Sequence, residues 1–405
     1  MTDETTPAGP WAAPMPEETF TFMRDLLAAP SPVGYEGAMT FGVLEPRLRS
    51  FMPDGWAIHR YAGNASLVAD SAPGDEEKLS VMVVGHADKI RCQVRRIGDD
   101  GKVWIDSDSF LPMTLLGNEV LVFSRDPVDP ARSKVLRGAT VEALGAIHFA
   151  DAETRSGKKG VTKEQLYLEL HLTGEDRKAE VEALGIRDGD PILLDRPIRR
   201  GIGPDSFTGA YLDNGLGVFV AAEVARLIAE GDALKSVRLL SAAASHEEIG
   251  RMGSRVLAGH LRPDVVIAVD VSHDYVAAPG IESRRMTKTT MGEGFTLATG
   301  AIVSEQLNSL IEAASREAGI PYQMSVVGRD TGTDAMAAFF AGHDAATTSV
   351  GFPIRNMHTV SETGHTGDVL AAVHGIVAAI RAMDAKGMTR ADFEQGHVRL
   401  DLAEG

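Results

Sequence analysis

Two adjacent glutamates, Glu247 and Glu248, follow a run of small and apolar residues in the segment SAAASHEEIGRMGS. Like charges held together in a partly desolvated place disfavour each other's ionisation. A solvated loop would explain an ordinary Glu-Glu pair, because glutamates are mostly exposed. Bound divalent cations would explain the pair differently. One carboxylate would ligate metal, and its neighbour would accept a proton from water that the metal activates.

Other side chains suited to metal binding stand at the ends of further apolar runs. His86 and Asp88 close VMVVGHADK, and their i, i+2 spacing places both on one face of a strand. Asp270 closes VVIAVDVS, Asp213 precedes a predicted helix in GAYLDNGLG, and His358 lies in the turn-rich IRNMHTVSE. Each residue alone is explained by a hydrogen-bonded or solvated side chain. Together they suit divalent zinc, cobalt or manganese.

The elements that must position these residues follow from periodicity. Continuous apolar runs predict strands that are covered on both faces, and 3.6-residue periodicity predicts helices. The strands are expected at 65–70, 78–90, 237–245 and 264–272, and the helices at 19–29, 214–231, 251–260, 308–319 and 367–387. Strands that alternate with helices indicate an α/β fold with a mostly parallel central sheet flanked by helices. In such a sheet, functional groups gather beyond the carboxyl ends of the strands.

Residues 92–200 have a different pattern. Short strand-like runs (KVWIDS, EVLVFS, LYLELHL and DPILLDRP) alternate there with Gly, Pro, Asp and Arg, and only RKAEVEALG has helical character. We interpret this region as a β-rich domain inserted into the α/β domain, which then comprises 19–91 and 201–405. The acidic, proline-rich residues 1–18 are expected to form a flexible tail.

The composition excludes several kinds of partner. The formal charge of −17, from 57 acidic and 40 basic residues, argues against nucleic acid, which needs a basic surface. The longest apolar run, VLAAVHGIVAAIRAM, carries His374 and Arg381 and is too short and polar to predict a membrane span. Cys92 is the single cysteine and is expected to be buried. A chain without disulfides or a signal-like N-terminus fits a reducing cytoplasm.

These segments, in this order, resemble the dinuclear metallo-aminopeptidases called glutamyl or tetrahedral (TET) aminopeptidases, some of which have been named endoglucanases. The resemblance runs from about residue 20 to 385 and includes SPVGYEG, GNASLVA, GHADKI, LGIRDGDPI, LDNGLG, EEIGRMGS, PDVVIAVDVS, GTDA and MHTVSE. It implies a metallopeptidase-type α/β domain with an inserted barrel-like domain. It also implies a closed homo-oligomer, with contacts contributed by the inserted domain.

The resemblance further implies a role for each site residue. One or two divalent ions would be bound, with His86, Asp213 and Asp270 as ligands of one and Asp213, Glu248 and His358 as ligands of the other. Glu247 would be the general base, and Asp88 would orient the imidazole of His86.

The chain departs from the family pattern beside these residues. Lys89 stands where the family usually has Glu, Asn214 and Gly215 where it has Asp and Arg, and His246 where Gln is common. The ligands are kept while their neighbours change, which indicates an altered substrate pocket or altered occupancy of one metal position.

Three residues are candidate substrate contacts: His246, Arg284 and Arg285. The arginines could bind a substrate carboxylate or be solvated surface charges.

The motifs leave more than one function open. The first is a metal-dependent hydrolase of C–N bonds that acts as an aminopeptidase on short peptides. The second is a small-molecule amide or aromatic amine hydrolase of the 5-nitroanthranilic acid aminohydrolase type, in which activated water attacks a ring carbon and ammonia leaves. The third, a binding scaffold without activity, is disfavoured because the ligands and the base are intact.

Overall fold

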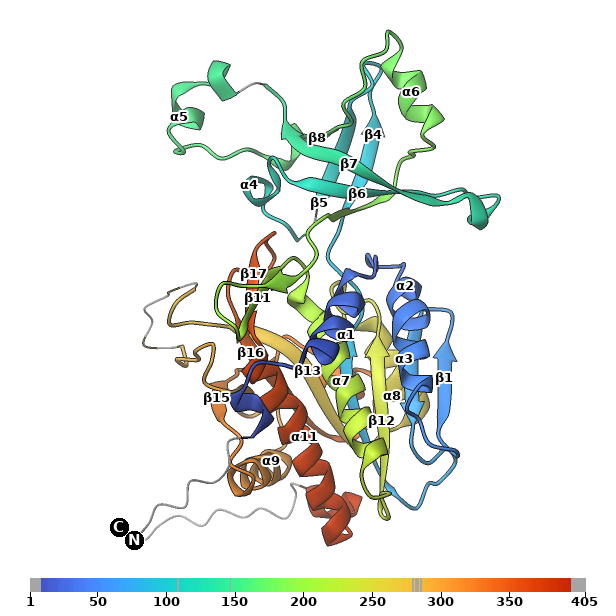
Figure 1. Cartoon of the computed structure of the whole chain (residues 1–405), viewed down its shortest axis with the longest axis vertical. Coiled ribbons are helices and arrows are strands. Elements are labelled where there is room, and N and C mark those ends of the chain that lie inside the picture. The colour runs from blue at the N-terminus through green and yellow to red at the C-terminus, as the bar shows by residue number, and fades with distance from the viewer. Residues whose placement is uncertain are drawn as a thin grey trace.

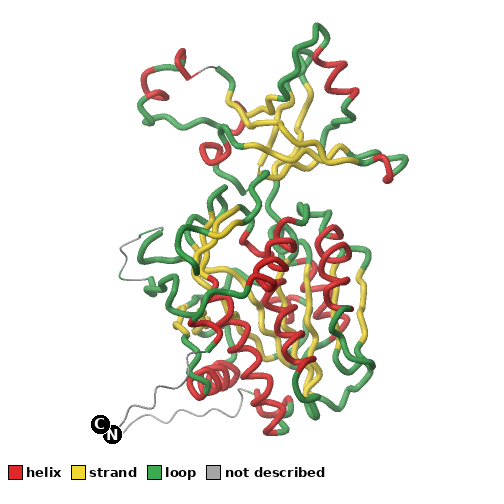
Figure 2. Tube along the Cα trace, in the orientation of Figure 1, coloured by secondary structure: helices red, strands yellow, loops and turns green. Residues whose placement is uncertain are grey.

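The chain comprises an α/β domain with a closed β-barrel standing on one end of it (Figure 1). The computed structural model describes residues 9–107, 109–145, 147–278, 280, 284 and 286–394. The barrel is built of strands and loops with a few short helices, whereas strands and long helices alternate in the α/β domain (Figure 2).

The α/β domain is built on an eight-stranded sheet. In spatial order its strands are β1 (Ala57–Tyr61), β2 (Ser66–Asp70), β12 (Val237–Ala244), β3 (Leu79–His86), β13 (Val265–His273), β16 (Ala346–Ile354), β14 (Phe295–Thr299) and β15 (Tyr322–Val326). The four central strands, β12 to β16 in this order, are parallel, and antiparallel pairings follow on both sides. The predicted fold class is confirmed, with a mixed sheet whose centre is parallel.

Helices cover both faces of this sheet, which explains the continuous apolar runs in the central strands. Alternate residues of β3 enter different cores: Val81 and Val83 pack into one hydrophobic cluster, Met82 and Val84 into another. The helices of the first face are α1 (Glu17–Ala28), α7 (Leu212–Glu230), α9 (Glu305–Glu317) and α11 (Thr366–Lys386), and those of the second are α8 (Met252–Leu261) and α10 (Ala337–Phe340). Three short segments link α1 to β1: α2 (Gly37–Met39), a π-helix (Thr40–Leu44) and α3 (Glu45–Arg49).

Close packing brings α7 against the strand that ends in His86. A Cβ at Gly85 would overlap the backbone of Gly217 in α7, so only glycine permits this approach. Asn214 ties the start of the same helix to β13, because its Nδ2 donates to the carbonyl of Val269 over 2.8 Å. The start of α7, which carries Asp213, is therefore held beside the ends of two central strands.

The barrel closes in the order β4 (Cys92–Ile97), β5 (Val103–Ser107), β8 (Leu166–Glu169), β7 (Lys134–Ala143), β6 (Glu119–Ser124) and β9 (Pro191–Leu194). Its short helices are α4 (Pro112–Leu115), α5 (Ala152–Arg155) and α6 (Arg177–Ala183). Cys92 is buried in the barrel core, and burial raises the pKa of its thiol to about 12, so it is no nucleophile at neutral pH.

A small sheet lies where the barrel meets the α/β domain. It consists of β10 (Arg199–Arg200), β11 (Ser206–Gly209) and β17 (Glu362–His365). Tyr211 lies just after β11. Its hydroxyl accepts a hydrogen bond of 2.7 Å from the backbone N–H of Leu194 in the barrel. Tyr211 also precedes Asp213 by two residues, so the barrel is anchored next to the start of α7.

Part of the expected tail, residues 9–18, packs against the α/β domain. Pro10–Ala12 form a 3₁₀ turn that packs on α11, where the Trp11 ring centroid lies 5.6 Å from that of His374. Met15 is buried, and Arg200 donates a hydrogen bond to its carbonyl. The aromatic and apolar side chains of this segment anchor it despite its proline content. Residues 1–8 lie outside the described part of the chain.

The long C-terminal helix α11 is longer than the apolar run seen in the sequence. In the described part of the chain, it is the one helix whose length and composition would allow it to cross a membrane. Its apolar window is 72% buried within the protein. It packs on α7 and α9, as expected of a core helix.

Candidate active site

A cavity of about 610 Å³ opens beyond the carboxyl ends of the central strands. This volume is typical of a small-molecule or short-peptide site. All five predicted metal ligands and the predicted base line it: His86, Asp213, Glu247, Glu248, Asp270 and His358.

Strand order explains how distant residues meet here. His86 is the last residue of β3, Glu247 and Glu248 follow β12, Asp270 lies in β13, and His358 follows β16. These four strands are neighbours and run in parallel, so their carboxyl ends share one edge of the sheet.

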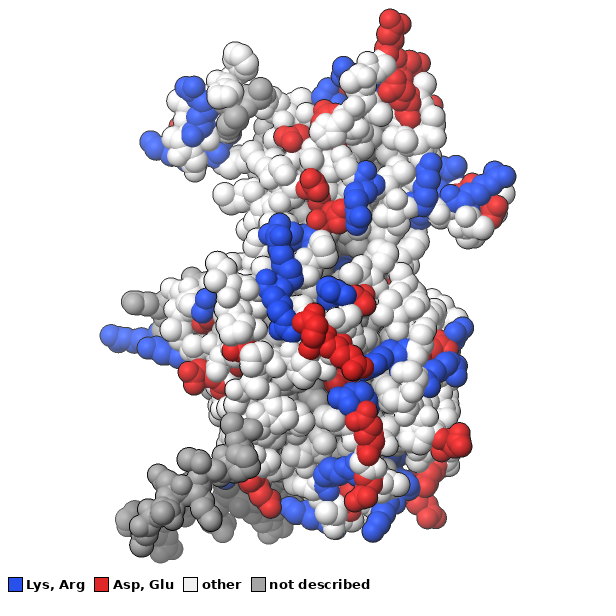
Figure 3. Space-filling model, in the orientation of Figure 1, with Lys and Arg blue, Asp and Glu red and all other residues white. Residues whose placement is uncertain are grey.

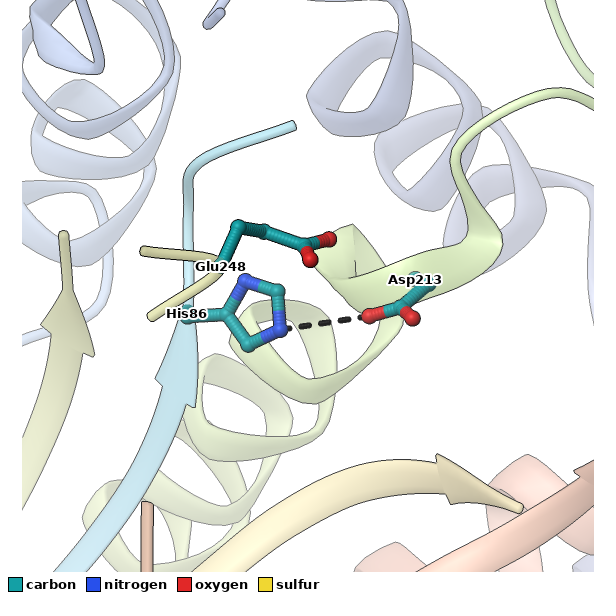
Figure 4. A group of neighbouring side chains, drawn as sticks. All are labelled: His86, Asp213 and Glu248. Carbon is teal, nitrogen blue, oxygen red and sulfur yellow. Dashed lines mark ion pairs between the residues drawn. The ribbon is translucent and has the colours of Figure 1, made fainter. Parts of the chain in front are cut away.

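Asp213 lies between the two histidines. Its Oδ1 is 3.2 Å from Nε2 of His86, and its Oδ2 is 3.2 Å from Nε2 of His358. Figure 4 shows the His86 ring and the carboxylates of Asp213 and Glu248 around a common space, with the dashed line marking the His86–Asp213 pair. One potential ligand atom from each of these three residues lies within 4.8 Å of the other two.

The remaining acids divide around Asp213. Near His86 Nε2 lie Glu247 Oε2 at 3.8 Å and Asp270 Oδ1 at 4.0 Å. Near His358 Nε2 lies Glu248 Oε1 at 3.9 Å. The arrangement offers one set of nitrogen and oxygen donors on each side of a shared carboxylate.

The electrostatics of this group fit divalent cations. Burial, reinforced by neighbouring carboxylates, raises the pKa of Glu247 to about 7 and that of Glu248 to about 10, and it raises the pKa of Asp270 well above its usual range. Burial also acts to raise the pKa of Asp213, but the hydrogen bond from His358 and the neighbouring imidazole of His86 lower it well below its usual range. Asp213 Oδ1 and Glu248 Oε1 are buried without a hydrogen-bond partner among the described residues. A divalent cation placed among these oxygens would stabilise the ionised carboxylates and would give the two unpartnered oxygens a ligand contact.

Asp88 holds the glutamate pair through its side chain. Its two carboxylate oxygens accept hydrogen bonds from the backbone N–H groups of Glu247 (3.0 Å) and Glu248 (3.1 Å). The family resemblance implies that Asp88 orients the imidazole of His86. Its carboxylate lies 3.5 Å from Nδ1 of His86, and its backbone carbonyl lies closer, at 3.2 Å. Asp88 therefore contacts the imidazole by its backbone and the glutamate turn by its carboxylate.

Glu362 is a site residue that sequence reasoning missed. Its side chain is buried and accepts hydrogen bonds of 2.6 Å from the backbone N–H groups of His358 and Leu212. It thus fixes the backbone of one histidine and of the residue before Asp213. Burial, together with the charge of Asp213, raises the pKa of Glu362 to about 8. The available signal was its place in MHTVSE, four residues after His358.

Arg251 is a second missed residue. Its Nε lies 3.3 Å from Oε1 of Glu247, and its Nη1 donates to Asp330 over 2.8 Å. Because a guanidinium group stays protonated, this contact fixes one oxygen of Glu247, while the other oxygen, Oε2, lies 3.8 Å from Nε2 of His86. Its place four residues after Glu247 was the available signal.

Two of the three predicted substrate contacts, His246 and Arg284, are absent from the described lining of the cavity. His246 does not line it; its Nδ1 lies 3.4 Å from the buried carboxylate of Glu36. Arg284 is exposed and lies outside the lining. Arg285 falls outside the described residues.

The fold and the site together define a hydrolytic enzyme of the aminopeptidase class. Residues 65–374 match the model of the M42 glutamyl aminopeptidase family, and the chain belongs to this family.

Relatives and solved structures agree with this assignment. The lysyl aminopeptidase of Pyrococcus furiosus is 26% identical over 348 residues, which cover 86% of this chain and 92% of the relative. Two solved structures share the fold. A TET aminopeptidase from a marine sediment Thaumarchaeota archaeon has a TM-score of 0.78 at 20% identity, with 94% of this chain and 100% of that one covered. The Pyrococcus horikoshii TET1 peptidase has a TM-score of 0.72 at 20% identity, with 89% and 98% covered. The family resemblance noted in the sequence is confirmed, and these matches give no support to the nitroanthranilate offshoot.

Proposed function

We propose that this chain is a metal-dependent aminopeptidase that removes residues from the N-terminus of short peptides. The observation that carries the proposal is the position of Asp213, 3.2 Å from each of two histidines in a cavity lined by three further acids. The family supports the aminopeptidase activity. The donor set supports the metal, and the residue roles are those that the family resemblance implies.

The ligands divide between two divalent ions, with zinc, manganese and cobalt as candidates. His86 and Asp270 would hold one ion, Glu248 and His358 the other, and Asp213 would be shared. When bound, such ions supply Lewis acidity, which polarises a carbonyl group and lowers the pKa of water.

Glu247 acts as the general base in this proposal. Its Oε2 lies 3.8 Å from Nε2 of His86, while Arg251 contacts its other oxygen and Asp88 fixes its backbone N–H. A carboxylate held in this way accepts a proton from water and returns it to the leaving amine. Glu362 keeps the backbones of His358 and Leu212 in place, so that both sides of the centre stay aligned.

Chelation tests the proposal. Exhaustive treatment with a chelator should abolish hydrolysis of a panel of L-aminoacyl anilides, and added zinc, manganese or cobalt should restore it. N-acetylated anilides serve as the control, because an aminopeptidase requires a free α-amino group. Full activity in metal-free protein, or equal cleavage of the acetylated substrates, would contradict the proposal. An aromatic amine such as 5-nitroanthranilate, included in the panel, tests the alternative.

We also propose that the chain forms a closed homo-oligomer through its barrel. The Pyrococcus horikoshii TET1 peptidase assembles into a tetrahedron or an octahedral shell. Broad uncharged areas lie between the acidic and basic side chains of the barrel domain (Figure 3). Large apolar side chains are exposed there, namely Leu111, Met113, Val128, Val135, Leu144 and Phe149. Such exposure is typical of an interface. Light scattering that gives a monomeric mass at micromolar concentration would refute this part.

A further inference from the structure

The remainder of the described cavity lining, here called the wall, differs in character from the proposed metal centre. Apolar side chains contribute much of this wall: Val271, Met286, Val326, Val327 and Met357. Serine, threonine and tyrosine hydroxyls, a glycine and His273 complete it. The ring of His273 packs against that of Tyr275, with centroids 5.4 Å apart.

The acidic residues in the described lining of the cavity all belong to the proposed centre. Among the described lining residues, the acids are Asp213, Glu247, Glu248 and Asp270, and none is lysine or arginine. The other described charged residues that adjoin this lining in the sequence do not line the cavity themselves. Asp330 is paired with Arg251, and Arg284 and Arg329 are exposed and do not line the cavity.

We propose that this wall makes the enzyme selective for peptides whose N-terminal residue is neutral and apolar, such as leucine or methionine, over lysine and glutamate. The inference rests on the proposed aminopeptidase function. A lysine or glutamate side chain placed against this wall would lose water without gaining an opposite charge, which is unfavourable. An apolar side chain would instead bury its methylene groups against valine and methionine.

This specificity differs from what the names of the family and of a relative state. The family is called glutamyl, and the Pyrococcus furiosus relative is a lysyl aminopeptidase. A pocket that prefers either charge needs a partner of opposite sign within reach of the side chain. The described wall of this chain offers hydroxyl and apolar groups in that place.

The first test compares L-aminoacyl p-nitroanilides with the metal-loaded enzyme. The value of kcat/KM for leucine and methionine should exceed that for lysine and glutamate by about ten-fold or more, the scale on which a pocket discriminates side chains. Preference for lysine or glutamate would overturn the inference while leaving the aminopeptidase function intact.

The second test adds a charge to the wall. Ser325 lies on β15, is half-buried and lines the cavity. Ser325→Asp should raise the ratio of lysine to leucine kcat/KM by about ten-fold or more, because it supplies the missing counter-charge. Ser325→Asn is the matched control, since it has the same shape without the charge, and should leave the ratio within about two-fold of wild type. Equal ratios in the two variants would contradict the inference.

Direct binding separates the inference from the proposed function. If no anilide is cleaved, the aminopeptidase proposal fails, and titration calorimetry with free L-leucine, L-lysine and L-glutamate then decides the nature of the wall. Tighter binding of leucine supports the inference. Equal or tighter binding of lysine or glutamate overturns it.

Discussion

Changing Glu247 or Glu248 to glutamine should affect different properties of the enzyme: the first change should lower kcat, and the second should lower metal affinity. Glu247 Oε2 lies 3.8 Å from His86 Nε2, and its other oxygen is 3.3 Å from Arg251 Nε. Glutamine keeps this shape and can still accept the contact from Arg251, but its amide cannot take up a proton. In Glu248, by contrast, the buried Oε1 has no hydrogen-bond partner in the described structure and is available as a ligand.

The expected magnitudes follow from these positions. Loss of a general base lowers kcat by about 100- to 10,000-fold. At about 1.4 kcal/mol per factor of ten, this corresponds to an activation barrier raised by roughly 3 to 5 kcal/mol. The metal content of Glu247→Gln should stay at the wild-type level. Glu248→Gln removes a charged ligand, so its metal affinity should fall by at least about 10- to 100-fold, the loss seen even for residues that only support a ligand.

Two measurements on the same preparations check this prediction. Metal content after desalting is determined by mass spectrometry, and kcat is measured with a leucine anilide at increasing metal concentration. Added metal should partly rescue Glu248→Gln and should not rescue Glu247→Gln. Near-native rates in both variants would refute the reasoning and restore a solvated loop. Metal loss in Glu247→Gln alone would show that the two roles are reversed.

Three further predictions concern the residues around this pair. Asp88→Asn places an amide against one of two N–H donors, so kcat/KM should fall by about 10- to 100-fold; an unchanged value would exclude a positioning role. Arg251→Met removes a cation beside Glu247, so the acidic limb of the pH profile of kcat/KM should move to higher pH, and an unmoved limb would contradict the contact. Burial lowers the pKa of Lys89 to about 7, so the unfolded chain binds more protons than the folded one between about pH 7 and 10. The free energy of unfolding of wild type, relative to Lys89→Met, should therefore rise by up to ~4 kcal/mol across this window in denaturant titrations, and a flat difference would refute the shift.

Periodicity predicted the central elements because their residues meet uniform surroundings. The strand ending in His86 is buried along its whole length, and its continuous apolar run shows this directly. β16 was not predicted, because Thr347, Thr348 and Ser349 in its first half are polar. These residues are buried, and the hydroxyl of Thr348 donates to Asn308 over 2.6 Å. Partners of this kind come from distant elements, and a local pattern does not contain them.

The barrel shows the same limit. The sequence indicated four of its strands, whereas β4 and β7 carry charged residues that hide their alternation. Four of the ten residues of β7 are exposed, so its residues did not form an apolar run. Closure of the barrel nevertheless buries the side chains of Val94 in β4 and Val141 in β7 almost completely.

The identity and order of the chemical groups could be determined from the sequence alone. Histidine and carboxylate side chains at strand ends limit the chemistry to a few kinds, and a parallel sheet brings such ends to one edge. Their positions relative to one another were decided by the tertiary structure. The hydrogen bond between Asp88 and Glu247 joins residues 159 positions apart in the sequence, and that between Asp213 and His358 joins residues 145 positions apart. The tertiary structure also decided the positions of Arg251, of Glu362 and of the apolar and hydroxyl side chains in the described cavity lining. The physical reason is that burial of apolar surface on segments far apart in the sequence sets the strand order and the helix packing. The spacing of residues within one segment does not contain this information.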